Sequence, residues 1–214
     1  MPKQEPRSHY FEPSPDTPHR KQNFCEEVVG KKFYFLTDSD TFSRKSLDFG
    51  SRLLLETSLE QLDFAQGERV LDLGCGWGPV GIVLQAFHPE LKLSFSDVNE
   101  RALELARENY RANIKHKQAD FVQSDGLEKL TGSFNKIFLN PPIRAGKQVI
   151  FRLFNEAYEA LLPGGELLIV IRKKQGADST RKELERLFGS NQVEDIARKA
   201  GYRVLRSGKA EETV

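Results

Sequence analysis

The sequence is poor in the residues that hold together disulfide-rich and metal-bound proteins. Its 214 residues include two cysteines, four histidines, one tryptophan and one methionine. Cys25 and Cys75 are too few for a disulfide framework or a zinc set, so we expect no metal and a reducing, cytoplasmic setting. No run approaches the roughly 20 apolar residues of a membrane span, so we expect no membrane partner.

An excess of charge of one sign is also missing. The 32 basic and 31 acidic residues give a formal net charge of +1, with 38% hydrophobic residues, as in an ordinary globular protein. A nucleic-acid partner therefore requires a local basic patch rather than an overall positive charge. Residues 1–20 hold five of the ten prolines and no apolar stretch of the kind found in a secretory signal.

Residues 67–81 are the stretch around which the rest is organised. Val70-Leu71-Asp72-Leu73 predicts a buried strand, Gly74-Cys75-Gly76-Trp77-Gly78 predicts a loop, and Pro79 suits the first turn of a helix. A glycine loop between a strand and a helix lets a ligand approach the backbone closely. It also presents free N–H groups at the helix N-terminus.

Strand and helix patterns alternate after residue 69, which predicts an α/β fold with a mostly parallel sheet and helices on both faces. Near the end of the chain, Thr180-x-x-Glu183 and Asn191-x-x-Glu194 resemble helix N-termini, and Gly201 is expected to end the second helix. The strands are expected at 69–73, 91–96, 121–122, 136–139, 166–171 and 202–206.

Two further strands are expected before this unit. Residues 23–29 and 32–37 are separated by Gly30-Lys31 and predict a β-hairpin. We therefore divide the chain into an N-terminal extension with the hairpin, residues 1–50, and a main domain, residues 51–214.

Polar residues follow the predicted strands at the edge where an open parallel sheet binds ligands. Asp72, two positions before the first glycine, suits an ammonium group or a water. Asp97 suits the two hydroxyls of a ribose, because Asn99 already fits the alternative role of capping the next helix. Asp125 suits an adenine amino group or, alternatively, an ordinary turn before Gly126.

The glycine loop also has to be compared with the fingerprint of dinucleotide-binding oxidoreductases. Gly76-Trp77-Gly78-Pro79-Val80-Gly81 satisfies G-x-G-x-x-G literally. That fingerprint, however, should begin with the glycine at the strand end. Counted from Gly74, its third glycine position is Pro79, so the register is wrong for a nicotinamide enzyme.

These residues resemble a known superfamily. Residues 71–78 look like the first motif of class I S-adenosylmethionine-dependent methyltransferases, and Asn140-Pro141-Pro142-Ile143 looks like the N-P-P motif of members that methylate amines. Residues 140–147, together with 8–11 and 42–51, resemble the small-domain branch related to bacterial small-subunit rRNA guanine-N2 methyltransferases. The resemblance implies a Rossmann-like seven-stranded sheet, S-adenosylmethionine as cofactor, and ribosomal RNA or a ribosomal subunit as partner.

The resemblance also implies residue roles. Asn140, Pro141 and Pro142 are the expected catalytic residues. An exocyclic amine has a delocalised lone pair, which acceptors such as the Asn140 side-chain oxygen and the Pro141 carbonyl can turn toward the methyl group. The implied substrate contacts are Ile143, Arg144 and Lys147. The implied cofactor contacts are Asp72, Gly74, Cys75, Gly76, Gly78, Asp97, Val98, Asp125, Gly126 and Asn140.

Several alternatives stay open at this point. Arg144, Lys147 and Arg172-Lys173-Lys174 form either a basic rim for RNA phosphates or an ordinary solvated surface. The N-P-P motif also occurs in enzymes that methylate protein glutamine or DNA adenine, but Ile143 stands where many of them carry an aromatic. A non-catalytic RNA-binding domain is a further possibility, against which the intact motif weighs.

Overall fold

The computed structural model describes residues 21–38 and 46–211. The resembling segment 8–11 and the first part of segment 42–51 lie outside the described residues. The chain begins with a two-stranded antiparallel hairpin, formed by β1 (Gln22–Val28) and β2 (Lys31–Thr37). The predicted hairpin is thus confirmed.

The main sheet has seven strands, in the order β5-β4-β3-β6-β7-β9-β8. The first five in this order are parallel, β9 pairs antiparallel with β7, and the edge strand β8 pairs antiparallel with β9. This confirms the predicted α/β fold. The strands are β3 (Arg69–Leu73), β4 (Lys92–Asp97), β5 (Asp120–Gln123), β6 (Phe134–Leu139), β7 (Leu161–Arg172), β8 (Val193–Lys199) and β9 (Tyr202–Gly208).

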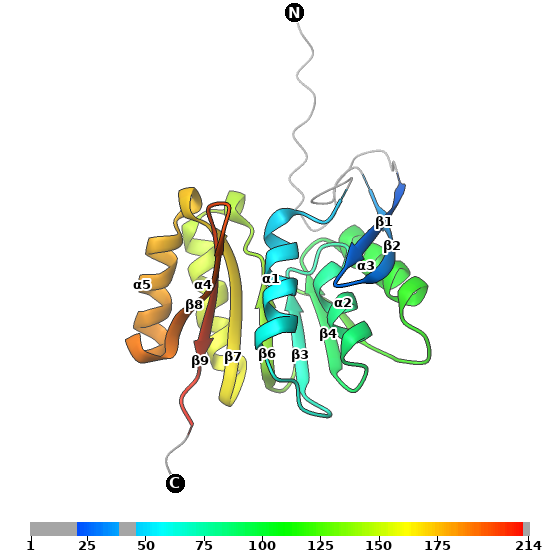
Figure 1. The fold of residues 1–214 in the computed structure, drawn as a ribbon. Helices are drawn as coiled ribbons and strands as arrows, with labels where there is room; N and C mark the ends of the chain where they lie inside the picture. The colour runs from blue at the N-terminus through cyan, green and yellow to red at the C-terminus, as the bar shows by residue number, and fades with distance from the viewer. Residues whose placement is uncertain (1–20, 39–45, 212–214) are drawn as a thin grey trace, which may run out of the picture.

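Helices cover both faces of the sheet (Figure 1). On one face lie α1, α2 and α3, packed on side chains such as Val70 and Phe138; on the other lie α4 and α5, packed on Leu71 and Ile137. The alternation within each strand follows from the two-residue period of β-structure. The helices are α1 (Phe49–Gln61), α2 (Pro79–Phe87), α3 (Glu100–Asn113), α4 (Lys147–Ala160) and α5 (Ala177–Phe188).

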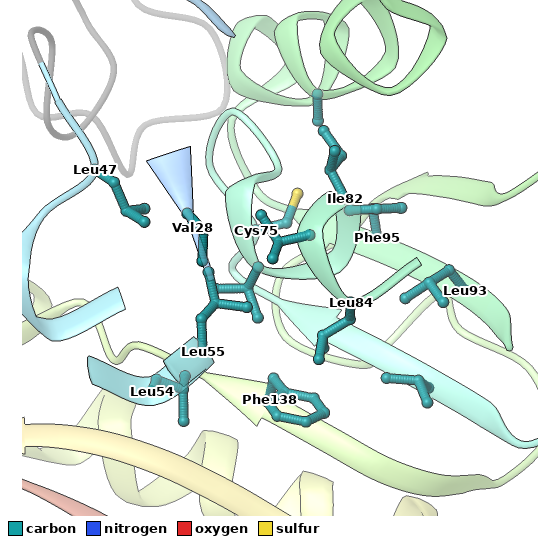
Figure 2. Close-up of a cluster of buried hydrophobic side chains, with 14 of the residues drawn as sticks. Val28, Leu47, Leu54, Leu55, Cys75, Ile82, Leu84, Leu93, Phe95 and Phe138 are labelled. Carbon is teal, nitrogen blue, oxygen red and sulfur yellow. The ribbon is translucent and has the colours of Figure 1, made fainter. Parts of the chain in front are cut away.

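The first of these two cores also joins the N-terminal segment to the sheet. Figure 2 shows Val28 from the hairpin, Leu55 from α1 and Cys75 from the glycine loop in the same apolar cluster as Phe95 of β4. Residues distant in sequence are therefore held together at the loop that the sequence singles out.

The hairpin is fastened to α3 by two asparagines. Asn109 accepts a hydrogen bond from the backbone N–H of Leu36 (2.7 Å) and donates to its carbonyl (2.9 Å). One turn later, Asn113 makes the same pair of bonds with Tyr34, at 2.9 and 2.8 Å. The two side-chain amides thus pair with the backbone of β2 as a neighbouring strand would. Asn109 also donates to the carbonyl of Trp77 (2.9 Å), which ties the hairpin to the glycine loop.

Three predictions near the C-terminus are wrong. Asn191-x-x-Glu194 does not start a helix, because residues 193–199 form the edge strand β8, and Gly201 lies in the turn to β9 with φ 80°. Pairing with β9 overrides the helical preference of this charged segment, and charges suit an exposed edge strand. Thr180 does not cap α5, since its N–H donates to Gly176 inside the first turn.

Within the described part of the chain, no helix is both long and apolar enough to cross a membrane.

The two asparagines of α3 give a first prediction. Asn109 is 1% exposed and makes three hydrogen bonds, so Asn109→Ala leaves buried backbone groups unpaired. We expect this variant to lose roughly 2–3 kcal/mol of the free energy of unfolding, and the half-buried Asn113→Ala only about 1 kcal/mol. Urea unfolding followed by the fluorescence of Trp77, the only tryptophan, measures both. Equal losses would contradict this account of the hairpin.

Candidate functional site

The predicted polar groups meet at one edge of the sheet. The parallel strands β3, β4, β5 and β6 all end there, in the register Leu73 beside Ser96 and Leu139, and Asp97 beside Gln123. Because β3 is central, the glycine loop that follows it lies between Asp97 on one side and Asn140 on the other. The sequence-based expectation that these groups share an edge is therefore correct.

The glycine loop adopts a backbone that side chains disfavour. Gly74, Gly76 and Gly78 all have positive φ, at 65°, 56° and 85°. A Cβ at Gly78 would lie 3.1 Å from the Ala106 Cβ, so α3 packs directly against the loop, whereas a Cβ at Gly76 would meet nothing within 4 Å. The loop is thus closed toward the protein and open above Gly76, where a ligand can lie against the backbone.

Two carboxylates, the buried Asp72 and the half-buried Asp97, hold this loop and the helix after it. Asp72 is 4% exposed, and its Oδ2 accepts the N–H of Gly81 in α2 at 2.9 Å. Asp97 accepts the N–H of Gly76 (2.8 Å) through Oδ2 and that of Asn99 (2.9 Å) through Oδ1. The two carboxylates therefore set the distance between the loop and the ends of β3 and β4.

Burial raises the pKa values of both carboxyls. The pKa of Asp72 rises to about 7, mainly by desolvation, although the Gly81 N–H opposes the shift and the negative charge of Asp97 adds to it. Desolvation also raises the pKa of Asp97 to about 6, although the backbone N–H groups that donate to this carboxylate oppose the shift. A cationic or hydroxyl-bearing ligand at this edge would favour the ionised forms. Oδ1 of Asp72 has no hydrogen-bond partner among the described residues.

Cys75 and Val98 contribute chiefly through their backbones. The N–H of Cys75 donates to Ser96 at 2.9 Å, and its carbonyl accepts from Gly78 at 2.9 Å. Its thiol is buried, and desolvation together with Asp97 and Asp72 raises its pKa well above the ordinary value, so it is not a nucleophile. The Val98 carbonyl accepts from the Gln123 side chain at 3.2 Å, which ties the β4 and β5 ends together.

Asp125 lies at the outer side of the site and is already engaged. Its Oδ1 accepts from Arg152 at 2.6 Å, and Arg152 also donates to Glu156 at 2.7 Å. Gly126 is buried with φ 62°, and Oε2 of Glu156 lies 2.1 Å from where a Cβ would stand. Sequence reasoning did not identify this arginine as part of the site, because it belongs to α4 and is 27 residues from Asp125.

The Asn140-Pro141-Pro142 segment leaves the sheet at the end of β6. The carbonyl of Pro142 accepts from Ala145 at 2.9 Å, which starts the short 3₁₀ turn Ile143–Ala145. The Asn140 side chain donates through Nδ2 to Oγ of Ser51, at the start of α1, at 3.0 Å. Among the described residues, no backbone group bonds to the Pro141 carbonyl, so it stays available as an acceptor.

The three expected substrate contacts behave differently. Ile143 is half-buried and packs on the core under α4, so its side chain contributes at least in part to packing. Arg144 and Lys147 are exposed, and Lys147 lies over the ring of Phe151, with its Nζ 4.9 Å from the centroid. The expected basic rim is thus exposed beside the Asn140 segment.

Sequence reasoning missed Asn109, which ties the hairpin to the loop. Asparagine is unfavourable inside helices, so the pair Asn109 and Asn113 at i, i+4 was the available signal. The loop residue Trp77 is 2% exposed and packs edge-on against Phe35 and Phe24 of the hairpin. Among the described residues, no group of three His, Cys, Asp or Glu side chains could hold a metal ion.

Comparisons with known proteins agree with this geometry. The family model of the methyltransferase small domain matches residues 32–206. The Bacillus subtilis (strain 168) protein YbxB, itself uncharacterized, is 40% identical over 206 residues, which is 94% of this chain and 98% of that protein. The ribosomal RNA large subunit methyltransferase G of Stutzerimonas stutzeri (strain A1501) is 35% identical, over 92% of this chain and 51% of that protein.

A solved structure is similar over most of the chain. The T. thermophilus 16S rRNA N2 G1207 methyltransferase RsmC, in complex with AdoMet and guanosine, has a TM-score of 0.79 and 27% identity, over 90% of this chain and 51% of that one. The chain thus spans about half the length of the curated rRNA methyltransferases that it matches. The family match and the glycine loop agree on the cofactor. The chain belongs to the methyltransferase small-domain family, whose members use S-adenosylmethionine.

Proposed function

We propose that this protein methylates the exocyclic N2 amine of a guanine in small-subunit ribosomal RNA. The observation that carries this proposal is the Asn140-Pro141-Pro142 segment at the end of β6, beside the glycine loop that follows β3. Support comes from the similar T. thermophilus protein, which is a 16S rRNA N2 G1207 methyltransferase. The names of other relatives support ribosomal RNA as the class of substrate, although they name the large subunit.

The carboxyl edge suits the cofactor chemically. We assign the ammonium group to Oδ1 of Asp72, which has no partner among the described residues, and the ribose hydroxyls to the Asp97 carboxylate. Gly74, Gly76 and Gly78, with Cys75 and Val98, supply backbone contacts. Asp125 and Gly126 lie on the adenine side, where Oδ2 of Asp125 remains for an amino group while Oδ1 holds Arg152.

The chemistry on the protein's side consists of orienting an amine. When bound, S-adenosylmethionine would supply a methyl group on a sulfonium that leaves as a neutral thioether, and the methylated amine would release one N–H proton to solvent. Oδ1 of Asn140 and the carbonyl of Pro141 accept the two N–H groups of the amine, which turns its lone pair out of conjugation with the ring. Two consecutive prolines fix this backbone and offer no competing N–H. Most of the rate enhancement then comes from positioning.

The surface around Asn140 suits RNA phosphates. Arg144, Lys147 and Arg172-Lys173-Lys174 are exposed, and all follow strands that end at this edge. Of the acidic side chains along this edge, Asp125 and Glu156 are paired with Arg152, and Asp178 is paired with Arg203. A guanine within a duplex has to be extruded before it reaches such a pocket, which favours a loop or bulge as target.

Large-subunit RNA is the second candidate substrate, because curated relatives that match most of this chain carry that name. Labelled S-adenosylmethionine offered with separated small-subunit RNA, large-subunit RNA, DNA and protein distinguishes these substrates. Digestion and mass spectrometry of the labelled nucleotide then identify the amine. Label in N2-methylguanosine of small-subunit RNA is the expected result. Label confined to protein or DNA would overturn the proposal.

Substitution of Asn140 tests the amine-orienting role. We expect Asn140→Ala to lower kcat about a hundredfold, as loss of one positioned group does in other active sites. Its affinity for S-adenosylmethionine should stay within about fivefold, because Asp72 and Asp97 are unchanged. Single-turnover kinetics and calorimetry measure the two quantities separately. Normal turnover in this variant would contradict the mechanism.

Substitution of the basic rim tests the RNA-binding role. Arg144→Ala combined with Lys147→Ala should raise the KM for RNA roughly tenfold at low salt, because two phosphate contacts are lost. The matched control is Lys92→Ala, an exposed lysine at the start of β4 and hence at the opposite edge of the sheet. An equal effect of the control, or RNA binding that is insensitive to salt, would contradict a phosphate-binding rim.

A further inference from the structure

The Asn140 side chain has two ends of opposite hydrogen-bonding character. Its Oδ1 accepts hydrogen bonds, whereas its Nδ2 donates them. With Oδ1 toward the substrate the residue recognises an N–H group, and with Nδ2 toward the substrate it recognises a lone pair, such as that of a ring nitrogen. The direction of this amide therefore decides which kind of nitrogen the site can hold.

Among the residues that the structure describes, one side chain fixes this direction. Ser51 is 4% exposed, and its Oγ accepts the hydrogen bond from Nδ2 of Asn140 at 3.0 Å. Among the described residues, Oδ1 of Asn140 has no partner. In the described part of the chain, the buried side-chain atoms without a hydrogen-bond partner are Asp195 Oδ1 and Ser207 Oγ, and Asn140 Oδ1 is not one of them. The oxygen is therefore open to the solvent side of the site.

Ser51 is itself held rigidly. It lies in the first turn of α1, where the N-cap Asp48 accepts from its N–H at 3.1 Å and from that of Gly50 at 3.0 Å. The same helix places Leu54 and Leu55, both fully buried, in the core under the sheet. The hydroxyl thus approaches Asn140 from an element fixed at both the cap and the core.

We propose that Ser51 is a positioning residue that holds Nδ2 of Asn140 and thereby turns Oδ1 toward the substrate. It acts through Asn140 and makes the site select an N–H-bearing amine over a ring nitrogen. The effect on turnover rests on the proposed amine methylation. The orientation of the amide, in contrast, can be measured without any substrate.

The alternative is that Ser51 merely packs α1 against the end of β6. Ser58 provides a matched control for that role, because it is fully buried in the same helix and its Oγ donates only to the helical carbonyl of Leu54, at 2.7 Å. Ser51→Thr is the conservative variant, since it keeps the hydroxyl.

Nuclear magnetic resonance of protein labelled with ¹⁵N-asparagine tests the orientation. The Asn140→Asp variant identifies the Asn140 side-chain signals by their disappearance. We expect one of the two Nδ2 protons to be shifted downfield and to exchange slowly in the native protein and in Ser58→Ala. In Ser51→Ala both protons should exchange quickly. Fast exchange of both protons in the native protein, as expected if the hydroxyl donated to Oδ1, would overturn the proposal, and so would unchanged signals in Ser51→Ala.

Turnover of the RNA substrate tests the consequence. Ser51→Ala should lower kcat about tenfold, which is the effect of one hydrogen bond, with little change in affinity for S-adenosylmethionine. Ser51→Thr should restore turnover, and Ser51→Ala should have no further effect in an Asn140→Ala background. An equal loss in Ser58→Ala, or additive losses with Asn140→Ala, would overturn the proposal. If the native protein methylates no RNA, the proposed function fails, while the amide signals still decide the role of Ser51.

Discussion

The site depends on two carboxylates at the ends of the neighbouring strands β3 and β4. Asp72 is buried and Asp97 is half-buried, which is costly for charges, and hydrogen bonds from the backbone N–H groups of Gly81, Gly76 and Asn99 offset part of that cost. These bonds hold the glycine loop in its left-handed conformation and set the start of α2. Because desolvation raises the pKa values of both carboxyls, a cationic or hydroxyl-bearing ligand would favour their ionised forms when it binds. The same two carboxylates therefore determine both the conformation of the loop and the recognition of a ligand.

The elements that surround this pair are arranged to keep it in place. The hairpin packs on Trp77 and is tied to the loop through Asn109, while α1 approaches from the other side and brings Ser51 to Asn140. The N-terminal segment thus contacts both halves of the site, the glycine loop after β3 and the Asn-Pro-Pro segment after β6. Packing of the hairpin and of α1 is thus coupled to the geometry of the candidate site through a few polar contacts.

Much of this arrangement follows from sequence patterns. Apolar runs that end in Gly74, Asp97 or Asn140 predict strands that share one edge, because the carboxyl ends of parallel strands meet there. Contacts between distant segments leave no such pattern, which is why the partners of Ser51 and Arg152 could not be predicted, and the asparagine pair 109 and 113 gave only the signal of an unfavourable residue inside a helix. The error at residues 193–199 has a related cause: Glu, Ala, Arg and Lys favour a helix locally, but pairing with β9 decides the outcome.

Proton release on cofactor binding tests the central role of the carboxylates most directly. In the cofactor-free protein their pKa values are about 7 for Asp72 and about 6 for Asp97, so at pH 6 they retain protons that binding of an ammonium and a ribose would displace. Affinity should consequently rise between about pH 5 and pH 7. Calorimetry of S-adenosylmethionine binding at about pH 6, in buffers of different ionisation enthalpy, should show release of on the order of one proton, and fewer in Asp97→Asn. Binding without proton release, or with proton uptake, would contradict the account.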